Sequence, residues 1–236
     1  MDNLYLGIET SSTNCSLGLF KNDELVDLLE VNEGYSHGEV LAMMVDDLLK
    51  KHNLSLKNIK AIGIGKGPGS YTGLRIGVAF AKGLAFSNSI KLIAIDSLRN
   101  MAMQIVQDRS LTLKLGDALI SLVDARRDEV YLQIYNTKGE AINKTKAQVI
   151  DNSRFQELRE YKNVYCFGSG SDKLASLNEI ARSFIHITEV FPSVLGMGLL
   201  LNSNYLSGKF EAEAYLEPFY LKEFIAGAPK KNNLVP

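Results

Sequence analysis

Blocks of apolar residues separated by short polar turns predict a series of buried strands along the chain. The first block, Leu4–Glu9, is an apolar run that ends in an acid, and the polar turn Thr10–Asn14 follows it. Two more strand-like stretches, Ser16–Phe20 and Glu24–Val31, lie on either side of the turn at Asn22-Asp23. This alternation predicts a three-stranded meander with a carboxylate at the end of its first strand.

The same pattern returns in the second half of the chain. Ala118–Asp124 reads as a strand that ends in an acid, and Glu129–Tyr135 as the strand after the next turn. In each half a helix follows the meander, and then a strand that runs into glycines. These helix and strand pairs are Ser36–His52 with Ile59–Ile64, and Asn152–Tyr161 with Val164–Phe167.

A repeated βββαβα order predicts an α/β fold of two similar, stacked subdomains, each a mixed sheet covered by helices. The alternative is chance, because acids follow buried strands in many α/β proteins. The apolar pattern is interrupted between Asp108 and Gly116. We therefore expect an N-terminal subdomain over residues 1–108 and a smaller C-terminal subdomain with a tail over residues 109–236.

Composition narrows the class of protein. The 236 residues are 46% hydrophobic and 22% charged, which is typical of a soluble globular protein. Lys and Arg number 26 and Asp and Glu 27, so the net charge is −1. A protein that holds RNA alone usually has a basic excess, so any link to RNA is expected to run through a partner.

Cysteine use and the first residues of the chain indicate where the protein works. Cys15 and Cys166 are far apart and neither belongs to a CxxC, which favours a reducing compartment and buried, inert thiols. The first residues show no basic stretch followed by an apolar run, and no uncharged apolar segment approaches the roughly 20 residues that span a bilayer. We expect a soluble, cytoplasmic protein.

The most unusual segment is the glycine-rich stretch Gly65–Gly77, which follows a predicted strand and opens a predicted helix. Ser70 or Thr72 could cap that helix. The glycine spacing matches neither the GxxxxGK[ST] phosphate loop nor the GxGxxG dinucleotide fingerprint. The segment therefore predicts a close backbone approach rather than an ordinary nucleotide loop.

The helix after this loop is apolar on almost every side, and small residues recur along it at every fourth position. Glycine inside a helix costs about 0.5–1 kcal/mol relative to alanine, so another backbone is expected to approach it closely. The neighbouring helix Ser36–His52 opens with a capping box at Ser36 and Glu39 and carries adjacent methionines, which suit an adaptable contact surface. The two helices either bury each other or form a protein–protein interface. The second reading predicts interface contacts at Val40, Met43, Met44, Leu48, Gly73, Leu74, Gly77, Ala81 and Ala85.

Several of these motifs together resemble one known family. The stretch Ile8–Ser11 and the run Gly67–Gly77, which reads GPGSYTGLRIG, are similar to the TsaB (YeaZ) family. The resemblance continues through Asp124–Tyr131, Gly168–Gly170 and Pro218–Leu221, so it spans essentially the whole chain.

The resemblance implies a fold of two tandem ribonuclease-H-like subdomains of the actin-like ATPase superfamily. It also implies a function: a non-catalytic subunit that partners TsaD, with TsaE, in forming N6-threonylcarbamoyladenosine at position 37 of tRNAs that read codons beginning with adenine. Members of the family form homodimers when alone and pair with TsaD through their N-terminal helices. Contact with tRNA is expected only through the complex.

Catalytic and cofactor sites are expected to be absent. In TsaD, two histidines four residues apart hold a metal, whereas the corresponding segment Ser97–Gln104 has no histidine. His37 begins a helix, where a solvated surface position is expected. The superfamily implies a vestigial phosphate loop at Thr10, Ser11 and Ser12, with nucleotide contact only in the complex. The alternative function is a stand-alone ATPase or a glycoprotease-type peptidase, although no GxSxG nucleophile elbow occurs.

Overall fold

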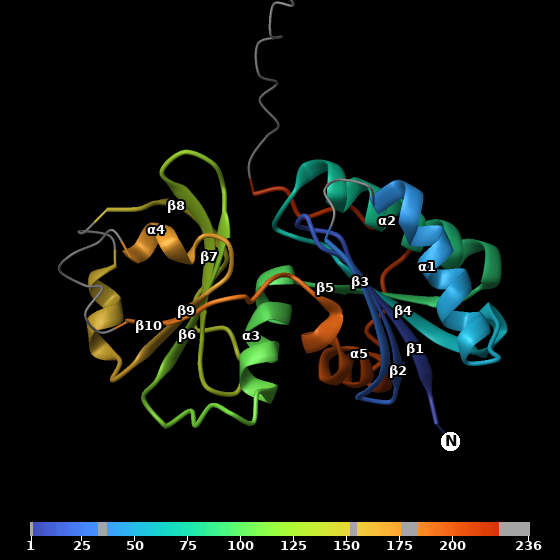
Figure 1. The fold of residues 1–236 in the computed structure, drawn as a ribbon, viewed down its shortest axis with the longest axis horizontal. Coiled ribbons are helices and arrows are strands. Elements are labelled where there is room, and N and C mark those ends of the chain that lie inside the picture. The colour runs from blue at the N-terminus through green and yellow to red at the C-terminus, as the bar shows by residue number, and fades with distance from the viewer. Residues whose placement is uncertain (1, 33–36, 152–154, 176–183, 222–236) are drawn as a thin grey trace, which may run out of the picture.

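The structure is a computed structural model, and it describes residues 2–32, 37–151, 155–175 and 184–221. The predicted capping box at Ser36 and Glu39 lies partly outside the described residues, because Ser36 is not among them. Two sheets stand side by side with one helix between them (Figure 1).

The first sheet has five strands in the order β3-β2-β1-β4-β5. Strands β1 (Leu4–Glu9), β2 (Cys15–Lys21) and β3 (Glu24–Val31) form the predicted antiparallel meander. Strands β4 (Ile59–Gly65) and β5 (Lys91–Ile95) continue the sheet in parallel with β1. Because β1 lies in the middle, its buried apolar run and its terminal acid sit at the centre of the sheet.

The second sheet repeats this arrangement. Strands β6 (Ala118–Asp124), β7 (Glu129–Tyr135) and β8 (Lys146–Val149) form the second meander. Strands β9 (Val164–Phe167) and β10 (Phe184–Ile187) add in parallel, which gives the order β10-β9-β6-β7-β8. The two orders match strand for strand, so the predicted duplication and the tandem ribonuclease-H-like architecture are confirmed.

The helices differ more between the two halves than the strands do. In the first half, α1 (His37–Lys51) and α2 (Tyr71–Asn88) lie together on one face of the sheet (Figure 1). In the second half, the structure describes the helix after β9 over Ser171–Ala175 (α4). The helix predicted over Asn152–Tyr161 is wrong in type, because the described part of it forms a 3₁₀ turn, Gln156–Glu160.

Helix α3 (Ser97–Gln107) forms a layer shared by the two sheets. Leu98, Met101 and Ile105 pack against residues of β6, β7 and β9, while Met103 packs with residues of the first sheet. Buried contacts therefore join the two halves through one helix.

Helix α5 (Met197–Leu206) returns to the first half of the molecule, on the face of the sheet opposite α1 and α2 (Figure 1). Its residues Met197 and Leu201 pack with Tyr5 and Phe20 of the first sheet. The division near Asp108 remains a prediction. The predicted C-terminal range nevertheless contains a helix that belongs spatially to the N-terminal sheet.

After α5, the segment Glu211–Leu221, which we call the C-terminal strap, runs along the first half. Glu211 forms a bridge with Leu92 of the edge strand β5. Leu216 is buried in the core, and the Phe219 N–H donates to the carbonyl of Lys66 at 2.7 Å. None of the described helices is both long enough and apolar enough to cross a membrane.

Candidate interaction surface

The glycine-rich loop packs directly on the turn between β1 and β2. Ser70 caps α2, since its hydroxyl accepts a hydrogen bond from the Gly73 N–H at 3.3 Å, and its own N–H donates to the Ser11 carbonyl at 2.7 Å. A Cβ on Gly69 would overlap Ser11, and a Cβ on Gly73 would overlap the carbonyl oxygen of Thr10. The glycines therefore permit the close backbone approach that the sequence predicts.

This packing closes most of the predicted phosphate loop. Thr10 and Ser11 are 0% and 1% exposed, and the Thr10 hydroxyl already donates to the Gly73 carbonyl at 2.8 Å. Ser12 is half-buried, and its hydroxyl accepts from the Asn14 N–H at 3.2 Å. Of the three predicted residues, only Ser12 is partly open to solvent. A nucleotide contact at this loop remains an untested prediction.

The acid at the end of β1 is completely buried. One Glu9 oxygen accepts from the Ser11 N–H at 2.9 Å, and the other accepts from the Ser97 hydroxyl at 3.0 Å and the Asn100 side-chain amide at 3.4 Å. Burial raises the pKa of the Glu9 carboxyl, and the three hydrogen bonds oppose that rise. The sequence indicates the acid at this strand end but gives no sign that α3 covers it.

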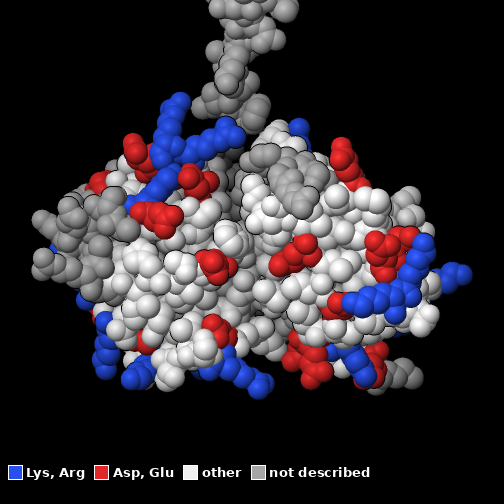
Figure 2. All heavy atoms as spheres, in the orientation of Figure 1, with Lys and Arg blue, Asp and Glu red and all other residues white. Residues whose placement is uncertain are grey.

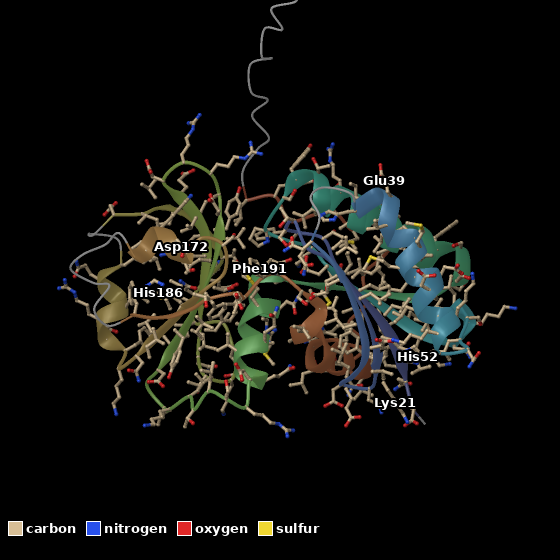
Figure 3. The ribbon with its side chains drawn as sticks, in the orientation of Figure 1. Lys21, Glu39, His52, Asp172, His186 and Phe191 are labelled. Carbon is tan, nitrogen blue, oxygen red and sulfur yellow. The ribbon has the colours of Figure 1, made fainter. Side chains whose placement is uncertain are left out.

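The Glu9 cluster extends to the segment that leads into α5. The Asn100 side-chain amide also donates to the carbonyl of Ser193. The Ser193 hydroxyl donates to Glu30 at 2.6 Å and lies 3.2 Å from the Ser16 hydroxyl. Figure 3 places the neighbouring Phe191 between the two halves of the molecule. These buried hydrogen bonds thus fix the position of α3 relative to the returning chain.

The stripe of small residues on α2 faces the protein interior. Gly73, Gly77, Ala81 and Ala85 are all buried, and a Cβ on Gly77 would overlap the Thr10 hydroxyl. The structure corrects the sequence-based interface at this point, because these residues contact their own sheet. Three more of the nine predicted residues are buried as well, namely Met44, Leu48 and Leu74.

The opposite side of the same two helices is exposed. Met43 is 58% exposed and Val40 is half-buried on α1, and Phe86 is 81% exposed on α2. Ala79 and Gly83 of α2 are exposed as well, and a Cβ on Gly83 would meet nothing within 4 Å. We call Val40, Met43, Ala79, Gly83 and Phe86 the outer helical face. An interface on α1 and α2 stays a prediction, and the residues predicted for it on α2 lie on the buried side of that helix.

The corresponding strand end in the second half is open. The side chain of Asp124 is 47% exposed and pairs with Lys173 at 2.6 Å, and Lys173 also donates to the carbonyls of Arg127 and Glu129. Arg126 and Arg127 both have positive φ, 70° and 51°, which non-glycine residues adopt uncommonly. Figure 2 shows acidic and basic side chains interspersed on the face it presents, without a single basic field.

The histidines and cysteines are used in packing and pairing. His37 is buried, which corrects the expected surface position, and its Nε2 lies 2.8 Å from the Ser12 carbonyl. His52 lies at the end of α1 and contacts Asp27 at 2.7 Å, and Figure 3 shows it far from His186. Both cysteines are buried as predicted, and burial raises the pKa of the Cys15 thiol to about 11. Among residues 2–32, 37–151, 155–175 and 184–221, no three His, Cys, Asp or Glu side chains cluster as a metal site.

Comparison with known proteins agrees with this architecture. The family model for TsaD, the tRNA N6-adenosine threonylcarbamoyltransferase, matches residues 34–202. The chain is 29% identical to the tRNA threonylcarbamoyladenosine biosynthesis protein TsaB of Escherichia coli, over 94% of this chain and 95% of that protein. The chain belongs to the family that this TsaD model describes, in its TsaB (YeaZ) branch.

Two further comparisons extend over nearly the whole length. The TsaB protein of Haemophilus influenzae is 28% identical over 94% of this chain and 95% of its own. The structure of YeaZ from Pseudomonas aeruginosa superposes with a TM-score of 0.76 at 23% identity, covering 93% of this chain and all of that one. The structural likeness shows that the family's two-sheet fold is shared.

Proposed function

We propose that this chain is a non-catalytic subunit in the biosynthesis of N6-threonylcarbamoyladenosine in tRNA, and that it partners a TsaD-type transferase. The observation that carries the proposal is the similarity, over more than nine tenths of the chain, to biosynthesis proteins of that pathway. The proposal includes assembly with TsaE, modification at position 37 of tRNAs that read codons beginning with adenine, and work in the cytoplasm.

The geometry supports an accessory role. The His, Cys, Asp and Glu side chains that the structure describes do not group as metal ligands, and the hydroxyls at the β1–β2 turn are largely covered by α2. The outer helical face, by contrast, leaves Met43 and Phe86 in solvent. We infer that this face pairs with the transferase, and with a second copy of the chain when the transferase is absent.

Reconstitution tests the accessory role. The purified chain alone is expected to form no threonylcarbamoyladenosine and to hydrolyse ATP no faster than background. Addition of the transferase and TsaE of the same organism, with the activated threonylcarbamoyl-adenylate, is expected to restore modification in a manner that depends on this chain. Turnover of ATP or peptides that scales with the concentration of the chain alone would favour the alternative, a stand-alone enzyme.

Substitution at Gly83 tests the surface. Gly83→Glu places a carboxylate in open space, so the fold should persist while the charge opposes burial against a partner. Light scattering and co-purification are expected to show a monomer that no longer retains the transferase. Ser203→Glu, on the exposed side of α5, is the matched control and should change neither result. A folded Gly83→Glu protein that dimerises and binds normally would move the interface elsewhere.

A further inference from the structure

A compact cluster of two tyrosines and one arginine stands at the start of α2. The guanidinium of Arg75 lies 4.3 Å from the centre of the Tyr71 ring, and its Nε donates to the Tyr220 hydroxyl at 3.2 Å. The rings of Tyr71 and Tyr220 are 5.0 Å apart between centroids and tilted by 36°. Tyr220 comes from the C-terminal strap, so residues 145 positions apart build one surface feature.

Arg75 and Tyr220 are the exposed members of the cluster, and Tyr71 is half-buried. Tyr220 is 38% exposed and its neighbour Phe219 37%, and Arg75 is an exposed residue. Of the three guanidinium nitrogens of Arg75, only Nε has a hydrogen-bond partner among the residues that the structure describes. The two Nη groups remain as a planar pair of donors, held in place by the ring beneath and the hydroxyl beside them. Such a fork matches a carboxylate.

The C-terminal strap does not need Arg75 to hold it in place. Leu216 is buried in the core, and Lys82 donates to the carbonyls of Ala214 and Leu216 at 3.5 Å and 3.1 Å. The Phe219 N–H bonds to Lys66 as well. The strap is thus already anchored when it reaches Tyr220, which leaves the arginine–tyrosine contact available for another purpose.

The position of Arg75 connects the cluster to the outer helical face. Arg75, Ala79 and Gly83 are all exposed and follow one another at every fourth position, so they share one side of α2. A partner that lies along Ala79 and Gly83 would reach the guanidinium at one end and Phe86 at the other.

We propose that Tyr71, Arg75 and Tyr220 form an anchor that binds a carboxylate side chain of the transferase subunit. The inference rests on the proposed function, since that names the partner. Tyrosine and arginine are the residues that most often dominate the energy of protein interfaces. A protein carboxylate fits better than an RNA phosphate, because the chain has a net charge of −1 and its visible surface mixes both signs (Figure 2).

Three variants test the anchor by titration calorimetry against the transferase of the same organism. Arg75→Ala is expected to weaken binding about 10- to 100-fold and to reduce its dependence on salt. Arg75→Lys keeps the charge but loses the fork, so an intermediate loss is expected. Tyr220→Phe keeps the ring and removes only the hydroxyl, and its affinity should fall less than about threefold. All three should unfold at nearly the wild-type temperature.

The outcomes separate the anchor from the function on which it rests. Failure of the wild-type chain to bind the transferase would contradict the proposed function. Normal binding by Arg75→Ala would overturn the anchor alone. Loss of tRNA binding by the assembled complex, with the affinity for the transferase unchanged, would assign the guanidinium to a phosphate instead. Loss of self-association alone would assign it to a second copy, and would equally overturn the proposal.

Discussion

The ends of β1 and β6 are equivalent in the duplicated fold, yet their terminal acids differ in burial and in bonding partners. Glu9 at the end of β1 is fully buried and held by neutral donors from the β1–β2 turn and α3. Asp124 at the end of β6 is half-exposed, and it pairs with Lys173 and accepts from the Arg126 N–H. One strand end is thus packed into the interior, while the other remains a charged turn in solvent.

The difference follows from what covers each strand end. In the first half the 18-residue helix α2 lies over the β1–β2 turn, because Gly73 and Gly77 let it approach Thr10. In the second half Lys173, on the described part of α4, reaches the equivalent turn, where it pairs with Asp124 and donates to the carbonyls of Arg127 and Glu129. Two copies of one strand plan therefore differ in what contacts the acid at the strand end. The acid of the first half is buried, and that of the second half is a half-exposed ion pair.

Glycine positions on α2 give the largest expected effect. Gly73→Ala would force a methyl group into the Thr10 carbonyl, and we expect it to lower the free energy of unfolding by about 3 kcal/mol. Gly83→Ala, its matched control on the open side, should raise that free energy by about 0.5–1 kcal/mol through helix propensity. Urea unfolding measures both. Equal effects at the two positions would mean that α2 does not pack on the turn as described.

The same two glycines show which parts of the structure could be predicted from the sequence. Seven strand segments and the duplication follow from apolar runs and turn residues, since those patterns are local. The sequence does not predict which side of α2 is buried, because this helix is apolar nearly all round. It carries small residues at Gly73 and Gly77 as well as at Ala79 and Gly83. Which side meets Thr10 is decided by a contact between residues more than sixty positions apart.

Replacement of the buried acid should change how stability depends on pH. The folded-state pKa of Glu9 lies above its ordinary value of 4.5, so the folded protein binds this proton more readily than the unfolded chain. Its contribution to stability is therefore full below pH 4.5 and declines as pH rises through the raised pKa. Glu9→Gln should remove that decline while keeping the free energy of unfolding within about 2 kcal/mol of wild type. Urea midpoints from pH 4 to 8 test this, and an unchanged pH profile would contradict it.

The smallest effect is expected at two partly exposed ion pairs, one in each half. Lys51, and then His52, hold the pKa of Asp27 at about 2, below its ordinary 3.8. The pair stabilises the protein above pH 3.8, and this stabilisation is lost as pH falls through about 2. Asp27→Asn should cost about 1 kcal/mol at pH 7, and Asp124→Asn no more than that. Thermal unfolding at pH 7 compares them, and a loss of several kcal/mol at Asp124 would show that the second turn is more than a surface pair.

The return of α5 to the first sheet has a consequence for how the chain folds during synthesis. Tyr5 and Phe20 are among the first residues made. The hydrophobic cluster to which they belong also needs Met197 and Leu201, near the end of the chain. A ribosome adds about 5–20 residues each second, so these N-terminal strands wait many seconds for the helix that covers one of their faces. The second sheet, β6–β10, is made from a continuous stretch of chain that is finished before α5. We therefore expect the order of assembly to run against the order of the sequence, with the N-terminal sheet the last to gain its full protection from hydrogen exchange.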